Sequence, residues 1–177
     1  MPRSARLYLR SGVVWYAGIV TKWIPLLVLT LGACGGSGND VAPVGKEPMT
    51  APYLTIQTTL ANDSIDELPK LSARVITAAE PVQAQAGVGD VIAGAGRVGA
   101  QDIDTARTSF EKVSMGLIKY LKAHPAEREG LEVIHCTMAF NNKGAYWVQK
   151  AGDIINPYHG KMMLHCGDRV AWDKAPG

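Results

Sequence analysis

The sequence predicts a mainly α-helical fold, a small antiparallel bundle of three or four helices followed by an irregular C-terminal segment. The clearest observation is a stripe of apolar residues that step by three and four positions from Ile103 to Tyr120, over about five turns. Two shorter segments, 53–60 and 68–79, carry apolar residues at the same helical spacing. Regular apolar stripes have to pack against other helices, so an antiparallel bundle is the expected architecture.

The first third of the chain has the features of an exported bacterial lipoprotein. Basic residues precede the apolar run WIPLLVLTLGA, which is shorter than the about twenty residues that a membrane-spanning helix needs. The stretch Leu31-Gly32-Ala33-Cys34 resembles a lipobox, in which the cysteine is lipidated after cleavage. We expect a lipoprotein signal over 1–33, a lipid anchor at Cys34 and a flexible tether over 34–50. A plain signal peptide with an incidental cysteine is the alternative.

These features predict a location in the bacterial cell envelope. Gly35 follows the cysteine where an aspartate would favour the inner membrane, so we expect an outer-membrane lipoprotein facing the periplasm. Residues 51–177 then form a single domain with one modest core. The net charge is +2 and no basic run follows the signal, which argues against nucleic-acid binding.

Helix boundaries are signalled at several points. Ser64 and Glu67 match a capping box for the second helix, although Pro69 would remove a backbone bond from it, so a start nearer Pro69 is the alternative. Asp102 or Asp104 begins the third helix, and Pro125 marks its end.

The segment 80–101 is rich in alanine and glycine, and we interpret it as a linker. Gly94, Gly96 and Gly99 match the spacing of a dinucleotide-binding loop. The surroundings do not fit, because no acidic residue follows at about twenty positions and too little chain remains for a doubly wound sheet.

The final third changes to short mixed segments with turn residues. Residues 131–134 alternate weakly, as a strand does, and 144–155 could form a short helix or a strand. Asn156-Pro157 favours a turn. His124 is expected to be a solvated residue at a helix end, and His159 to lie on the surface of the turn.

Two stretches of this part, VIHCTMA and KMMLHCG, hold Met, His and Cys in nearly mirrored order. Soft Cu(I) and Ag(I) prefer thiolate and thioether ligands. Cys136 and Met138 share a face if the chain is extended, and Met163 and Cys166 share a face of a helical turn. If the stretches meet, these four sulfurs form a candidate Cu(I) or Ag(I) site. The further candidate ligands are His135, His165 and Met162.

A disulfide between Cys136 and Cys166 is the alternative, since paired cysteines in an oxidising envelope usually join. It would close a loop of about thirty residues and contribute about 3 to 4 kcal/mol in the loop-entropy model. The methionines would then fill gaps in the core. Four aromatic residues would form either a docking surface or part of the core: Tyr146, Trp147, Tyr158 and Trp172.

The two stretches resemble the C-terminal signature of an uncharacterised bacterial envelope domain. That domain occurs alone as small lipoproteins, or attached to the periplasmic adaptor subunits of CusB-type copper and silver efflux systems. The resemblance lies in HCTMAFNNKGAYWVQ and IINPYHGKMMLHCG, and it extends weakly to YLTIQTTLAND. Thr137 departs from the Cys-Pro-Met of the family. The resemblance implies metal resistance, with an efflux adaptor as the expected partner.

Three classes of function remain open at this point. The first is a binding protein that sequesters copper or silver, or delivers it to the adaptor. The second is a disulfide-stapled interaction module without metal. A thiol oxidoreductase is the least favoured, because the cysteines do not form a C-x-x-C pair, and no catalytic triad or carboxylate pair stands out. We therefore expect a protein that is not an enzyme.

Overall fold

The structure is a computed structural model that describes residues 47–99 and 102–177. The predicted signal peptide and the lipobox cysteine, Cys34, lie outside the described residues. Helix α1 begins at Thr50 and the side chain of Met49 is buried, so the folded part begins at or before Met49.

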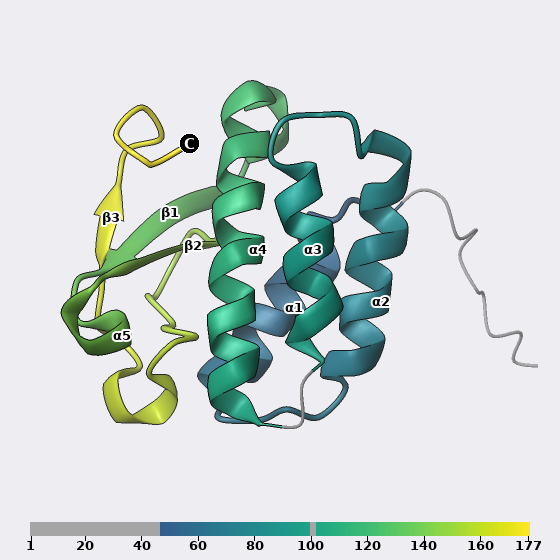
Figure 1. The fold of residues 1–177 in the computed structure, drawn as a ribbon. Helices are drawn as coiled ribbons and strands as arrows, with labels where there is room; N and C mark the ends of the chain where they lie inside the picture. The colour runs from purple at the N-terminus through teal and green to yellow at the C-terminus, as the bar shows by residue number, and fades with distance from the viewer. Residues whose placement is uncertain (1–46, 100–101) are drawn as a thin grey trace, which may run out of the picture. The chain divides into compact units, whose positions relative to one another are not determined.

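The described residues form five α-helices, three 3-10 helices and three strands (Figure 1). The α-helices are α1 (Thr50–Ala61), α2 (Leu68–Ala79), α3 (Val88–Val98), α4 (Ile103–Ala123) and the short α5 (Ala139–Asn142). The 3-10 helices are η1 (Glu80–Val82), η2 (Pro125–Arg128) and η3 (Gly160–Met163). The strands are β1 (Leu131–Cys136), β2 (Ala145–Lys150) and β3 (Asp168–Val170).

The predicted purely helical bundle is wrong, because the fold also contains a three-stranded antiparallel sheet in the order β2-β1-β3. Strands β1 and β2 gave a weak signal since neither has a fully exposed face. Val133 and Ile134 are adjacent and both fully buried, and three consecutive residues of β2, from Trp147 to Gln149, are buried as well. Alternation of apolar and polar residues marks a strand with one exposed face, and these strands lack such a face.

The predicted prolines and the aspartate cap mark helix boundaries in the structure, whereas the predicted capping box does not. Helix α2 begins at Leu68 with Pro69 in its first turn, which supports the alternative start. The capping box does not form, because Glu67 makes no capping hydrogen bond with its side chain. Asp102 caps α4 by accepting a hydrogen bond of 2.8 Å from the backbone N–H of Thr105. The helix ends at Ala123, just before Pro125.

The linker predicted over 80–101 is also wrong, since half of the segment forms helix α3. Glycine lowers helix propensity, which led to the linker interpretation. In the fold, Gly94 lets α3 approach α4 closely: an added Cβ would lie 2.7 Å from Val113 Cγ2 and 2.8 Å from Val113 N. On α4, Gly116 faces α3 in the same way, with an added Cβ 2.8 Å from Val91 N.

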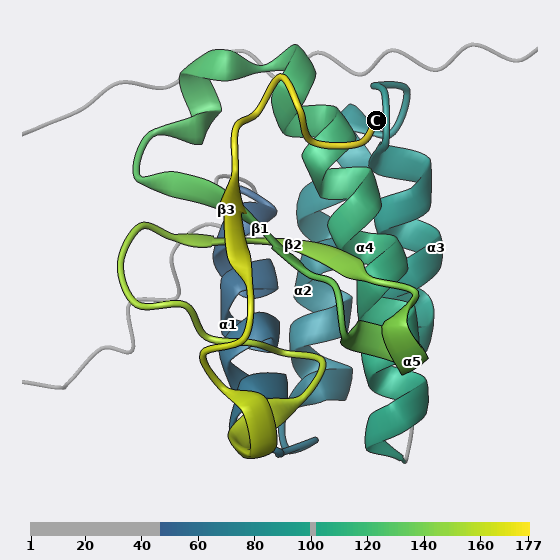
Figure 2. The same ribbon diagram turned by 90° about the vertical axis from the view of Figure 1, so that its left-hand side faces the viewer.

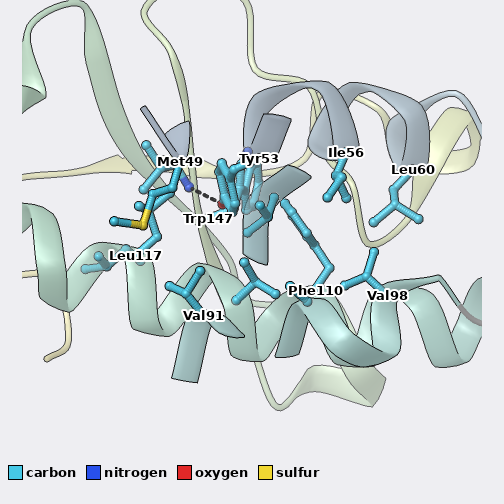
Figure 3. Close-up of a cluster of buried hydrophobic side chains, with 14 of the residues drawn as sticks. Met49, Tyr53, Ile56, Leu60, Val91, Val98, Phe110, Leu117 and Trp147 are labelled. Carbon is cyan, nitrogen blue, oxygen red and sulfur yellow. Dashed lines mark hydrogen bonds between the residues drawn. The ribbon is translucent and has the colours of Figure 1, made fainter. Parts of the chain in front are cut away.

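Helix α4 packs against α3 and also against β2, so it joins the helices to the sheet (Figures 1 and 2). Figure 3 shows the buried side chains that fill this junction, contributed by α1, α3, α4 and β2. Tyr53 of α1 stacks on Phe110 of α4, with ring centroids 4.8 Å apart. Phe110 in turn lies 6.2 Å from the ring of Tyr158, which meets Trp147 edge-on at 5.8 Å.

Two tyrosine hydroxyls make hydrogen bonds with backbone groups along the outer edge of β2. Tyr53 Oη accepts a hydrogen bond of 3.0 Å from Val148 N, and Tyr158 Oη donates one of 2.6 Å to Tyr146 O. Unpaired backbone groups at a sheet edge invite another strand to pair. At these two positions of β2, side chains of the same domain already satisfy them.

Candidate functional site

The two cysteines of the C-terminal part, called the thiol pair below, lie in contact. Strand pairing brings them together, because His135 of β1 pairs with Asp168 at the start of β3. The Sγ atoms of Cys136 and Cys166 are 2.9 Å apart and both thiols are free. Cys136 is fully buried, whereas Cys166 is half-buried. Any reagent or ion from solvent therefore meets Cys166 first.

The contact between the thiols affects their acidity. The hydrogen bond with Cys136, together with burial, raises the pKa of the Cys166 thiol to about 11. A thiol with this pKa stays protonated at neutral pH and is a slow nucleophile. Binding a metal here would require the metal to displace thiol protons.

Gly167 allows the chain after Cys166 to lie directly on the sheet. Its φ is +150°, and an added Cβ would lie 2.7 Å from Ile134 Cγ2 and 2.9 Å from Trp147 Cη2. A side chain here would push the chain off the sheet and separate the two sulfurs. Close backbone approach therefore requires glycine beside the thiol pair.

The candidate methionines do not lie where the spacing suggested. Strand β1 ends at Cys136, so Met138 lies in a turn rather than in an extended segment, and 46% of its side chain is exposed. Met162 in η3 is 82% exposed, and Met163 is half-buried. Among the large hydrophobic side chains of residues 47–99 and 102–177, Met138 and Met162 are the two that are exposed. Both belong to the stretches that carry the thiols.

The turn that follows Cys136 has an unusual backbone. Phe140, Asn141 and Asn142 all have positive φ, at 52°, 58° and 65°. Asparagine adopts this region at modest cost, whereas phenylalanine seldom does. The ring of Phe140 lies 5.2 Å from that of Tyr158, and this contact helps to hold the turn in place.

The histidines have separate environments. His135 is half-buried and stacks on Tyr146, with ring centroids 4.1 Å apart. His165 is exposed, and its Nδ1 lies 2.7 Å from Ile154 O. Since a carbonyl only accepts, Nδ1 carries the proton and Nε2 keeps the lone pair that a metal would need. His124 stacks on Tyr120 at the end of α4, at 4.2 Å.

His159 differs from the expected surface residue, because it is half-buried. Its Nε2 is the buried side-chain nitrogen or oxygen in the described part of the chain that lacks a hydrogen-bond partner. The sequence around it gave only a turn signal, so this environment could not be anticipated.

An ion pair ties the segment before Cys166 to the helices. Arg107 of α4 donates to Pro157 O at 2.9 Å and to Asp63 Oδ1 at 2.7 Å. Asp63 Oδ2 accepts from Lys161 N at 3.1 Å. These bonds hold the pKa of Asp63 below its usual value, with the Arg107 bond as the main cause. Gly160 has a φ of +59°, and a Cβ there would overlap Asp63 Oδ1.

Sequence reasoning did not connect Asp63 or Arg107 with the segment that contains Gly160. The turn signal at Asn156-Pro157 marked the right segment, but nothing in the spacing connects it with residues about fifty and one hundred positions earlier.

The four aromatic residues fall into two groups. Trp147 and Tyr158 belong to the core, with 0% and 6% exposure. Tyr146 and Trp172 are half-buried, and Arg128 lies 4.9 Å from the Trp172 ring centroid in a cation–π contact. A docking surface made of all four is therefore incompatible with the fold.

Within residues 47–99 and 102–177, no three His, Cys, Asp or Glu side chains come together as a metal-binding group. The same residues contain no helix with the length and apolarity needed to cross a bilayer. Comparison of the chain with protein-family models, with curated proteins and with solved structures gave no match.

Proposed function

We propose that this domain binds a soft monovalent metal, Cu(I) or Ag(I), at the thiol pair. In this proposal it is a lipid-anchored periplasmic protein that sequesters the metal or delivers it to the periplasmic adaptor of an efflux system. The observation that carries the proposal is the contact of Cys136 and Cys166, with sulfurs 2.9 Å apart. Two sulfurs that are already adjacent can bind one soft cation once they move apart, because a cation bonded to both requires a wider separation than 2.9 Å.

The exposed methionines support the same proposal. Exposed thioethers add little to a core, yet Met138 and Met162 are 46% and 82% exposed on the two stretches that carry the thiols. Thioethers bind Cu(I) and Ag(I) without losing a proton. They could capture the cation first, and the half-buried Cys166 would then receive it before Cys136.

A disulfide-stapled interaction module without metal is the second candidate, and the burial of Cys136 favours it. A fully buried thiol is poorly placed to collect an ion from solvent, but it can form a bond with a neighbouring thiol. The bond would link residues thirty positions apart and tie the end of β1 to the segment before β3. The loop-entropy model gives about 3 to 4 kcal/mol for such a closure.

Native mass spectrometry of the full chain, processed in a bacterial host and extracted in detergent, separates these candidates. Metal binding predicts free thiols and one tightly held Cu(I) per chain, lost when Cys136 and Cys166 are both changed to serine. Binding should also weaken as the pH falls, because protons compete for the thiolates. The Met138→Leu and Met162→Leu variants should slow loading more than they reduce its final extent.

Undiminished binding of one Cu(I) by the double serine variant would contradict the thiol site. A chain lighter by two hydrogens that takes up no copper would instead support the stapled module. Ser114→Ala is a suitable control, because it removes a buried hydroxyl that bonds Tyr53 and leaves every candidate sulfur unchanged.

A further inference from the structure

Asn156 is a fully buried polar residue whose side chain bonds the backbone of Cys166. Its Nδ2 donates a hydrogen bond of 2.8 Å to Cys166 O. Its backbone N–H donates one of 2.7 Å to Leu164 O. Asn156 thus closes the segment 156–166, called the cysteine loop below, by bonding two residues at its far end.

The remaining polar atoms of Asn156 shape the beginning of the same loop. Its Oδ1 accepts hydrogen bonds from Tyr158 N at 2.8 Å and from His159 N at 3.1 Å. Its backbone carbonyl accepts one of 3.2 Å from Gly160 N. Each polar group of Asn156 is therefore satisfied, and each bond is made within the cysteine loop.

Burying an amide is costly unless its hydrogen bonds are made, and a fully bonded amide fixes the local geometry. Beyond the loop, Arg107 and Asp63 fix the positions of Pro157 and Lys161. The hydrogen bond from Asn156 to Cys166 O then fixes the opposite end of the loop relative to these residues.

We infer that Asn156 is a positioning residue for the thiol pair, holding the backbone of Cys166 so that its Sγ lies against that of Cys136 before any ligand binds. The inference rests on the proposed function in taking the thiol pair as the functional site. It makes a separate claim, namely that the pairing of the two sulfurs depends on one buried amide.

The closeness of two thiols is measured by their effective concentration in exchange with glutathione. The two thiols and one glutathione disulfide give one protein disulfide and two glutathione thiols. The Cys136–Cys166 bond forms, the glutathione S–S bond breaks, and the two thiol protons pass to the glutathione sulfurs. The experiment uses the full chain with Cys34→Ser, which leaves Cys136 and Cys166 as its two thiols.

The first variant is Asn156→Asp, which keeps an oxygen for Tyr158 and His159 but loses the N–H that bonds Cys166. We expect the effective concentration to fall about five- to tenfold, the range typical for one hydrogen bond that holds a group in place. Asn156→Ser, which introduces a smaller and uncharged residue, should also lower the effective concentration. Both equilibria are measured without metal, under conditions where the variants are folded.

Two controls separate positioning from general stability. Asn62→Asp makes the same chemical change at an exposed asparagine, whose Nδ2 donates to Thr58 O at 2.9 Å, and should leave the effective concentration unchanged. Val75→Ala removes buried apolar atoms from α2. It should lower the stability of the domain while leaving the exchange equilibrium of the folded chain within twofold of the original.

Effective concentrations within twofold of the original in both Asn156 variants would overturn the inference. An equal fall in Val75→Ala would do the same, since the effect would then reflect stability alone. Failure of both Asn156 variants to fold would assign Asn156 to the fold in general and would also contradict the inference. A chain that binds no Cu(I) but shows the expected fall would disprove the proposed metal site and leave this inference standing.

Discussion

The helical half of the domain, residues 50–99 and 102–123, and the sheet half, residues 131–170, differ in the contacts that bring their backbones together. In the helical half, α3 and α4 pack through small residues such as Gly94 and Gly116, whose missing side chains let the backbones approach. In the sheet half, buried amides provide directional bonds. Gln149 Oε1 accepts from Trp147 Nε1 and Ile155 N, both at 3.1 Å.

This difference indicates which half positions its backbone more precisely. Apolar contacts are non-directional and tolerate small shifts, whereas hydrogen bonds to buried amides do not. Gln149 and Asn156 are 3% and 0% exposed. Gln149 donates to Asp153 O and Asn156 donates to Cys166 O, both in the segment that follows β2. The thiol pair lies in this half, where buried amides add hydrogen bonds to the backbone to the packing of apolar side chains.

The largest expected effect comes from removing Trp147, the fully buried aromatic residue at the centre of the sheet half. Trp147→Ala should lower the free energy of unfolding by about 3 to 5 kcal/mol, because it opens a large cavity against Tyr158 and Gly167. Urea denaturation followed by circular dichroism measures this. Trp172→Ala is the matched control, and its half-buried ring should cost less than half as much.

The same denaturation curves test whether the two halves are independent. Phe110 of α4 contacts both Tyr53 and Tyr158, so the two halves share one core and should unfold in a single transition. Two separate transitions in Trp147→Ala, with the helices surviving the sheet, would show that the halves fold separately.

A smaller effect is expected from two glycines on helix α3. Gly94→Ala should destabilise the domain by about 1 to 3 kcal/mol, since the new Cβ would lie 2.7 Å from Val113 Cγ2. Gly96→Ala should stabilise it by about 0.5 to 1 kcal/mol, because no atom lies within 4 Å and alanine favours the helix. Thermal unfolding of both variants gives the comparison. Equal shifts in the same direction would mean that α3 does not approach α4 closely.

Sequence reasoning succeeded where one face of a helix is buried and the other is exposed. The stripe on α4 was predicted from its spacing, and Ala106, Phe110, Val113 and Leu117 are all buried. It failed on α3, because its small residues resemble a linker until a partner helix covers them. On the sheet it succeeded only in part: 131–134 and 144–155 were marked as possible strands, where β1 and β2 lie, but the weak alternation of these segments did not predict a sheet.

The candidate site could be predicted only in part for a similar reason. The mirrored stretches identified Cys136 and Cys166, and the structure brings these two residues into contact. The positions of Met138 and Met162 were not predictable, since they depend on where β1 ends and η3 begins. Asn156 was noted as a turn residue, but its bond to Cys166 exists only once the loop has closed.

The smallest expected effect concerns the ion pair of Asp63 with Arg107, whose members bond Pro157 O and Lys161 N in the sheet half. The Arg107 bond and the Lys161 N–H lower the pKa of Asp63 in the folded state. A carboxylate with a lowered folded pKa adds stability above its unfolded pKa, and this contribution is lost as the pH falls through the folded value. We therefore expect Asp63→Asn to have a lower free energy of unfolding than the original at pH 7. The difference should be less than about 1 kcal/mol, because the ion pair is partly exposed.

The difference between Asp63→Asn and the original should shrink as the pH falls below about 4, where the unfolded carboxyl takes up its proton. Asparagine is the appropriate replacement, because residue 63 has a φ of 58° and asparagine accepts this conformation. Asp66→Asn, at an exposed carboxylate bonded only to nearby Ser64, serves as the control for general charge effects. Urea denaturation at several pH values provides the measurement. A difference that stays constant down to pH 2 would mean that the ionised carboxylate of Asp63 does not help to join the cysteine loop to the helices.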